Sequence, residues 1–368
     1  MTQEESWKAI QDVAYLAACV ANGTTPDAQR VKGMDLKQLY PVAKKHLLSS
    51  ITAFGLEAAG VQDARFFQAK AKAIRKVALL DAEMANLFEK LDEAGIWHMP
   101  LKGTVLQQYY PKYGMREMSD HDILFDATRA ADVKAIMEGL GFSTESYNKG
   151  NHDIYHKEPV VNFEMHRELF GAGSKKQLRD YYHNVEARLV KGAGFERRFT
   201  PEDFYIYMIA HEYKHYAGGG TGLRSLLDTY ALERKLGSSL NRDYIRRELD
   251  KLGLTEFEAK NRALSLHLFG GVPLTEEEQG MLSYVLSSGA YGTMHNHVEN
   301  EITEKGRFGY FLSRLTLPKE LMEQQFPVLK KAPALYPFFW MFRLLRGFFA
   351  NHKVFMYQLK AVIRRKKQ

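Results

Sequence analysis

Two carboxylates separated by one residue are the feature of this sequence best suited to chemistry. Asp120 and Asp122 flank His121 at the start of a strand-like run that continues with Ile123 and Leu124. Because side chains at i and i+2 project from the same face of a strand, the two negative charges meet there. Mg²⁺ prefers oxygen ligands and is usually held by one or two carboxylates together with substrate phosphates. The spacing therefore predicts a site for Mg²⁺ (or Mn²⁺) and a phosphate-bearing substrate.

A second strand offers a third carboxylate. Polar and apolar residues alternate from residue 160 to 166, which places Asn162, Glu164 and His166 on the face opposite Val161 and Phe163. A pair of catalytic metals usually needs a third acidic ligand. If this strand lies beside the Asp120 strand, Glu164 completes the metal site.

Phosphate groups need positive charge or free backbone N–H groups near that site. A helix is expected to begin at Gly103-Thr104, where unpaired N–H groups and the helix dipole favour anions. Lys102 and Arg116 can add positive charge at the same place.

These residues, together with others, resemble a known family. The run Pro100-Leu101-Lys102-Gly103, Tyr110-Pro111, Arg116, Asp120-x-Asp122-Ile123-Leu124, Gly141-Phe142, Glu164-x-His166 and His211-x-x-Lys214-His215 looks like the uncharacterised nucleotidyltransferase family of the DNA polymerase beta-like superfamily. The resemblance covers roughly residues 95–235. It implies a small mixed sheet with flanking helices and metal-dependent transfer of a nucleoside monophosphate (NMP) from a nucleoside triphosphate (NTP) such as ATP.

The resemblance also implies roles for individual residues. Asp120, Asp122 and Glu164 fall at the metal ligands, and Gly103-Thr104 falls at the superfamily's Gly-Gly or Gly-Ser pair. The remaining site residues are expected to bind phosphate, or to lie beside the metal or on the acceptor side: Lys102, Arg116 and Lys214 for phosphate; His166, His211, His215 and Asp228 for the other positions. The acceptor, whether a small molecule, sugar, RNA or protein, is not implied.

Two local features differ from the superfamily pattern. His121 stands where an apolar residue is usual, so it is expected to be a hydrogen-bonded core histidine or to lie at a sheet edge. Residues 105–119 separate Thr104 from Asp120, which predicts a longer connecting loop.

A competing motif predicts different chemistry. His211-Glu212-x-x-His215 fits H-E-x-x-H, in which two histidines bind Zn²⁺ and the glutamate acts as general base, and Glu233 is placed as a third ligand. Thr200 and Pro201 predict the start of the helix that carries this motif. A zinc-dependent hydrolase and a catalytically inactive NTP-binding or regulatory protein are therefore the alternatives to a transferase.

The pattern of apolar residues predicts an α+β fold, with a small mixed sheet between large helical regions. We expect an N-terminal helical region at 1–94, a nucleotidyltransferase core at 95–195 and a C-terminal helical domain at 196–323. Further helix starts are expected at Asn241 and Thr275. A basic, aromatic-rich, helical tail is expected at 324–368.

Composition bounds the remaining possibilities. The 368 residues are 45% hydrophobic, which suits a globular protein with a sizeable core. The single cysteine, Cys19, excludes an intramolecular disulfide and suits a reducing compartment, and the acidic N-terminal run does not resemble a secretory signal. A cytoplasmic location is therefore expected.

Positive charge is concentrated at the C-terminus. Ten Lys and Arg and no Asp or Glu follow Glu323, and Arg346, Lys353, Lys360 and Lys367 recur at intervals of seven. This spacing predicts one basic helical face beside apolar aromatic residues. The tail can lie on an anionic membrane, bind nucleic acid, or pack its aromatic side chains on the body of the protein.

Overall fold

The computed structural model describes residues 3–350 and Met356. Helices before the sheet are α1 (Gln3–Ala21), α2 (Ala28–Lys32), α3 (Leu36–Lys45), α4 (Ser49–Ala58) and α5 (Ala64–Glu93). Helices within the sheet region are α6 (Lys102–Leu106), α7 (Ala130–Gly139) and α8 (Lys176–Tyr182), with short 3₁₀ turns at Gln107–Tyr109, Ala127–Arg129 and Val185–Arg188. Later helices are α9 (Pro201–Gly218), α10 (Leu223–Leu236), α11 (Arg242–Leu252), α12 (Thr255–Gly270), α13 (Glu276–Ser288), α14 (Met294–Leu315), α15 (Lys319–Gln325) and α16 (Tyr336–Ala350), with 3₁₀ turns at Pro327–Lys330 and Pro333–Leu335.

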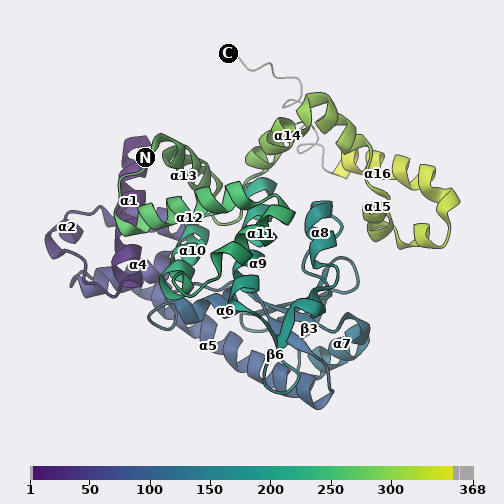
Figure 1. The fold of residues 1–368 in the computed structure, drawn as a ribbon, viewed down its shortest axis with the longest axis horizontal. Helices are drawn as coiled ribbons and strands as arrows, with labels where there is room; N and C mark the ends of the chain where they lie inside the picture. Colours follow the sequence, from purple (N-terminus) through teal and green to yellow (C-terminus); the bar gives the residue numbers. More distant parts are fainter. Residues whose placement is uncertain (1–2, 351–355, 357–368) are drawn as a thin grey trace.

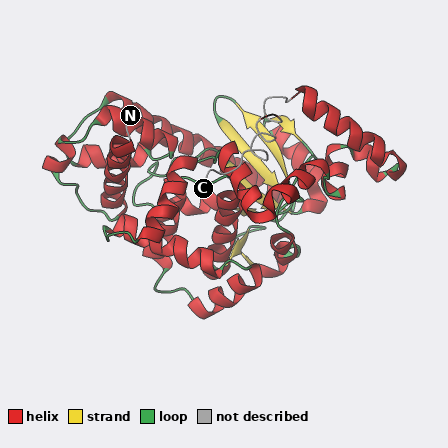
Figure 2. Cartoon of the chain, turned by 90° about the horizontal axis from the view of Figure 1, so that it is seen from above, coloured by secondary structure: helices red, strands yellow, loops and turns green. Residues whose placement is uncertain are grey.

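The sheet is small and mixed, and helices surround it (Figure 2). Its five strands lie in the order β1-β2-β5-β4-β3, and β6 and β7 form a separate two-stranded sheet. Strands β2 and β5 are parallel, whereas the other neighbours are antiparallel. Their bounds are β1 (His98–Pro100), β2 (His121–Phe125), β3 (Ser143–Ser146), β4 (His152–Lys157), β5 (Val161–His166), β6 (Leu189–Lys191) and β7 (Arg197–Phe199). The predicted α+β class with a mixed sheet is confirmed.

The two faces of the sheet have different partners. Ile123 and Phe125 of β2 pack with Val77 and Leu80 of the long helix α5 and with Val133 of α7. Leu124, between them in sequence, belongs to a different core that includes residues of α9 and α11. Because alternate strand residues face opposite sides, the face of Leu124 is also that of Asp122, and α9 covers it.

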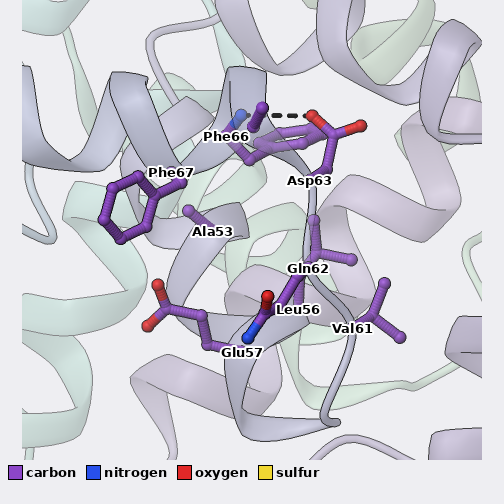
Figure 3. Close-up of a pocket in the computed structure, with 9 residues that line it drawn as sticks. Ala53, Leu56, Glu57, Val61, Gln62, Asp63, Phe66 and Phe67 are labelled. Carbon is purple, nitrogen blue, oxygen red and sulfur yellow. Dashed lines mark hydrogen bonds between the residues drawn. The ribbon is translucent and has the colours of Figure 1, made fainter.

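Helices far apart in the sequence share a third core. Buried residues of α1, α3 and α4 pack with buried residues of α10, α12 and α13. Figure 1 shows these purple and green helices side by side. A cavity of about 430 Å³ lies at the edge of this region, where Leu56, Val61 and Phe66 line the connection between α4 and α5 (Figure 3). The predicted division of the chain near residues 94, 195 and 323 stays a prediction.

Local capping signals predict the later helices well. Thr200 caps α9 with Pro201 in its first turn, Asn241 caps α11, and Thr275 caps α13 in a capping box with Glu278. The long connection before Asp120 is also present, because α6 ends at Leu106 and β2 begins only at His121. Of the four basic residues spaced at sevens, Arg346 lies in α16, and Lys353, Lys360 and Lys367 lie outside the described residues.

Candidate active site

Strand register brings two of the predicted metal ligands together. Asp122 of β2 is the parallel partner of Glu164 of β5, so their side chains rise from neighbouring positions on one face. This face continues with Leu124 and His166, which are also partners. The predicted proximity of the Asp120 strand and the Glu164 strand is therefore confirmed.

Asp120 lies one residue before β2, and the charges of the other two carboxylates shift its pKa. Burial and then the negative charges of Asp122 and Glu164 raise its pKa to about 6. Three carboxylates within Coulomb range of one another form a strongly negative centre. A divalent cation bound there would lower this repulsion, so the donor set fits an oxygen-preferring metal.

Asp122 is held by two positively polarised neighbours. Lys102 Nζ donates to Asp122 Oδ1 at 2.6 Å, and His166 Nε2 donates to the same oxygen at 2.8 Å. Burial alone would raise the pKa of Asp122, but the charge of Lys102 and the contact with His166 hold it well below its usual value. Asp122 therefore carries a full negative charge.

The backbone of Lys102 is unusual. Its φ of 45° lies in the left-handed region, which costs a residue other than glycine on the order of 1 kcal/mol. The ammonium of the same residue is hydrogen-bonded to Asp122. A local distortion is thus maintained at the site that binds the carboxylate.

His152 joins the site, and the sequence interpretation did not include it. Among residues 3–350, the ligand atoms of His152, Glu164 and His166 lie within 4.8 Å of one another. His152 Nε2 is 3.6 Å and His166 Nε2 is 3.5 Å from Glu164 Oε2. Imidazole ligands extend the range of metals that this centre can hold from Mg²⁺ to Mn²⁺ and Zn²⁺.

Helix α9 places three predicted site residues and Tyr207 over this face. Burial and the positive charge of Lys102 lower the pKa of His211 and of Lys214. Charges of Asp122 and Glu164 also act on Lys214 and His215, which shows that both lie near the carboxylates. Burial raises the pKa of Tyr207, with Lys102 acting in the opposite direction. Lys214 is therefore placed to offer a positive charge, while the neutral histidines can donate hydrogen bonds.

His121 is a core histidine, one of the two predicted possibilities, but only its Nδ1 is hydrogen-bonded within the described residues. It is fully buried, its Nδ1 is hydrogen-bonded to Thr104 Oγ1 at 2.7 Å, and its Nε2 lies 3.3 Å from Asp81 of α5. These contacts tie the helix start at Gly103-Thr104 to β2. A Cβ on Gly103 would lie 2.5 Å from Arg116 Nη1, so no larger residue fits there without movement of that side chain. The predicted phosphate contacts of Gly103 and Thr104 stay predictions.

Arg116 and Asp228 form a buried pair with each other. Arg116 donates from Nε and Nη2 to the two carboxylate oxygens of Asp228, both at 2.8 Å, and the Tyr110 hydroxyl donates to Oδ1 at 2.7 Å. Arg116 is 7% exposed and Asp228 is 5% exposed. This pair joins the loop before β2 to α10. The contact of Arg116 with phosphate and the acceptor-side position of Asp228 stay predictions.

The residues of the zinc motif do not converge on one point. His211 Nε2 and His215 Nε2 are 3.1 Å apart, as two metal ligands would be. Glu212 instead accepts hydrogen bonds from Thr229 Oγ1 and Asn261 Nδ2, on helices α10 and α12. Glu233, the predicted third ligand, is paired with Arg242. Glu212 is therefore engaged by α10 and α12 and does not lie beside the two histidines as a general base. This geometry does not favour a zinc hydrolase.

Glu212 provides a pH-dependent prediction. Burial, with the nearby charge of Asp228, raises its pKa from 4.5 to about 7, so the folded state holds a proton that the unfolded state releases. The free energy of unfolding should therefore fall as pH rises from about 4.5 to 7. Glu212→Gln keeps the hydrogen bonds and removes this titration, so it should be more stable than the wild type by about 1–3 kcal/mol at pH 8.

Chemical denaturation of both proteins at pH 5 and pH 8 measures this difference. The expected result is near-equal stability at pH 5 and a more stable variant at pH 8. A stability difference that does not change with pH would contradict the assigned ionisation.

A basic groove lies along α5. It has a volume of about 490 Å³ and is lined by α3, the first residue of α4, α5, the residues before β2 and the residues before β5. Lys76 Nζ donates to the carbonyl oxygen of Ser119 at 2.5 Å, and its charge acts on Asp120. Lys44, Lys72 and Arg75 also line the groove, and Glu117 is the acidic residue in its lining. The groove therefore presents positive charge next to Asp120.

His152 and Lys76 could have been found only in part from the sequence. His152 is the partner of His166 across β4 and β5, but this depends on hairpin register. Lys76 lies in a stretch of α5 that is basic before Asp81 and acidic after it. That change in charge along α5 indicated that its basic half lies near negatively charged groups, such as Asp120.

The comparisons with known proteins agree with this geometry. A family described as uncharacterised nucleotidyltransferase matches residues 32–270, which is more than half of the chain and includes every predicted site residue. No curated protein and no solved structure shows a significant match. The family match is wider than the resemblance over residues 95–235 and also takes in α3, α4 and α5 before it and α11 and α12 after it. On this match, the chain belongs to a family of uncharacterised nucleotidyltransferases.

Proposed function

We propose that this protein transfers an NMP group from an NTP to an acceptor, with a divalent cation held by Asp120, Asp122 and Glu164. The observation that carries the proposal is the parallel pairing of Asp122 with Glu164, with Asp120 close enough for its pKa to rise. Bound there, Mg²⁺ or Mn²⁺ supplies Lewis-acid polarisation of the α-phosphate. The acceptor oxygen forms a bond to the α-phosphorus, the bond from that phosphorus to the β-phosphate bridge breaks, and pyrophosphate leaves.

Lys102 has two tasks in this proposal. It neutralises Asp122 when no cation is bound, because its ammonium donates a hydrogen bond to Asp122 Oδ1 at 2.6 Å. When the metal and the nucleotide bind, it exchanges Asp122 for a phosphate oxygen, and Lys214 adds a second positive charge from α9. His166 keeps Asp122 oriented through its hydrogen bond. His211 and His215 lie on the side from which the nucleotide or acceptor approaches.

The basic groove supports an acceptor or a leaving group that carries negative charge. Lys44 of α3 and Lys72 and Arg75 of α5 have no carboxylate within ion-pair distance among residues 3–350, whereas Lys70 of α5 is paired with Glu57. Cations that line a groove without an acidic partner attract anions from solution. Negative charge therefore fits this groove, whose Lys76 also interacts with Asp120.

Label transfer tests the proposed reaction. Purified protein is incubated with a metabolite-and-RNA extract and with NTP labelled at either the α- or the γ-phosphate. Nucleotidyl transfer moves the α-label to a product and releases the γ-label in pyrophosphate. A γ-label that moves to the product would indicate a kinase and overturn the proposal. An inactive NTP-binding protein would move neither label.

A further inference from the structure

Two histidines and one glutamate meet on one face of the sheet. His152 of β4 and His166 of β5 are direct antiparallel partners, and Glu164 lies two residues before His166 on β5. Opposite residues of paired strands, and residues two apart in one strand, share a face of the sheet. The ligand atoms of the three side chains all lie within 4.8 Å of one another, and the two imidazole ring centres are 4.8 Å apart. Strand register therefore builds a compact group of two nitrogen donors and one oxygen donor.

The separations within this group suit metal ligands better than hydrogen bonds. His152 Nε2 and His166 Nε2 lie 3.6 Å and 3.5 Å from the same oxygen, Glu164 Oε2. A hydrogen bond between nitrogen and oxygen is usually about 2.7–3.2 Å long. Two ligands that are each about 2.0–2.1 Å from a tetrahedral zinc ion lie about 3.4 Å from one another. Both N···O distances are therefore close to the distance between two ligands of one zinc ion.

The histidine rings can present a lone pair to such an ion. Nδ1 of His152 and Nδ1 of His166 are buried and have no hydrogen-bond partner in the part of the chain that the structure describes. A neutral imidazole carries one proton, so each ring can hold it on Nδ1 and keep a lone pair on Nε2, the atom that faces Glu164. The side chains of His152 and Glu164 are 28% and 23% exposed, so an ion can reach the group from solvent.

His166 connects this group to the carboxylate site. Its Nε2 donates to Asp122 Oδ1 at 2.8 Å. A metal bound at this nitrogen would replace that hydrogen bond, and the ring proton would move to Nδ1. Lys102 would still hold Asp122 through its own hydrogen bond. The exchange therefore leaves Asp122 with a positively charged partner.

We propose that His152, Glu164 and His166 bind one Zn²⁺ ion, at a position distinct from that of the cation in the proposed function. Two histidines and one glutamate form the ligand set of some catalytic zinc sites, in which the fourth position stays open for water or a substrate oxygen. Imidazole nitrogen suits Zn²⁺, whereas Mg²⁺ prefers oxygen ligands. Because both histidines approach Oε2, Oε1 of Glu164 is left for the cation shared with Asp120 and Asp122. Zinc binding does not require nucleotidyl transfer, so this proposal goes beyond the proposed function.

Zinc binding by the full chain, prepared without an affinity tag, tests the proposal. Metal-free protein is dialysed against buffered Zn²⁺ in the presence of excess Mg²⁺, and bound zinc is then measured. We expect one zinc ion per chain in the wild type. Removing a group that only supports a metal ligand typically costs about 10–100-fold in affinity, so His152→Ala, which removes a ligand, should cost at least about 100-fold. With Co²⁺ in place of Zn²⁺, the visible absorption of the bound ion should disappear in the same variant.

The matched control is His156→Ala. His156 lies on the same strand as His152, and its side chain is 42% exposed beside Glu145, so its loss should leave zinc binding unchanged. His215→Ala and Asp120→Asn should also keep zinc, because neither residue belongs to the group. Circular dichroism shows whether each variant is folded.

Three results would overturn the proposal: no zinc bound by the wild type, wild-type affinity in folded His152→Ala, or loss of zinc in His215→Ala. If His152→Ala does not fold, Glu164→Gln keeps the size of the side chain and should lose zinc in its place. Retention of zinc by folded Glu164→Gln would equally overturn the proposal. A protein that binds zinc but no NTP would count against the proposed function and not against this site.

Discussion

Replacing Asp122 with asparagine should abolish nucleotidyl transfer and leave the protein folded. Asparagine keeps the size of the side chain and can still accept the hydrogen bond from His166, but it loses the negative charge. A catalytic metal supplies several kcal/mol of transition-state stabilisation, so its loss should lower turnover by about 10³-fold or more. Transfer of the α-label from NTP measures this effect.

The control for Asp122→Asn is Asp132→Asn. Asp132 is an exposed residue in the first turn of α7 and pairs with Arg129 at the surface. The Asp132→Asn protein should transfer the label like the wild type, and circular dichroism should show that both variants are folded. Wild-type turnover by a folded Asp122→Asn protein would exclude Asp122 from the catalytic centre.

The second large effect concerns stability. Arg116→Met leaves Asp228 buried with Tyr110 as its remaining side-chain hydrogen-bond partner among the described residues, and breaking a buried ion pair typically costs about 3–5 kcal/mol. A protein of ordinary stability has about 5–15 kcal/mol in total, so this variant should be close to unfolding at elevated temperature. Chemical denaturation at pH 7 measures the loss.

Two variants test the reason for that loss. Arg116→Met/Asp228→Asn removes both charges and should recover part of the stability, because the cost comes mainly from the unpaired carboxylate. Arg129→Met breaks the exposed pair with Asp132 and should cost no more than about 1 kcal/mol. Equal losses for Arg116→Met and Arg129→Met would show that the buried pair does not stabilise the fold.

Much of this site could be predicted because its main signals are local. Strand alternation alone places Asp122 with Leu124 and Glu164 with His166, and the structure keeps both pairs on one face. Capping residues act within three positions of a helix start, so Thr200 and Thr275 could be read directly. The family resemblance implied that the two strands are neighbours, and the structure adds that they pair in parallel, with Asp122 opposite Glu164.

Other features depend on contacts that sequence spacing does not reveal. Arg116 was assigned to phosphate because of its charge, but Asp228, its partner, lies 112 residues away. Glu212 fits a zinc motif along the chain, yet its position on α9 turns it toward Asn261 instead of the histidines. His152 reaches the carboxylates through hairpin register. In each case a long-range contact, which sequence spacing does not show, sets the surroundings of the residue.

Calorimetric titration of the purified protein with each NTP tests the central claim most directly. It is carried out with and without Mg²⁺ on the wild type and on Asp120→Asn/Asp122→Asn, with bound metal measured on the same samples. We predict NTP binding that requires Mg²⁺ and is weakened by the double substitution. NTP binding that is unchanged by both the metal and the substitution, or bound zinc without any NTP binding, would contradict the assignment of these carboxylates as the metal and nucleotide site.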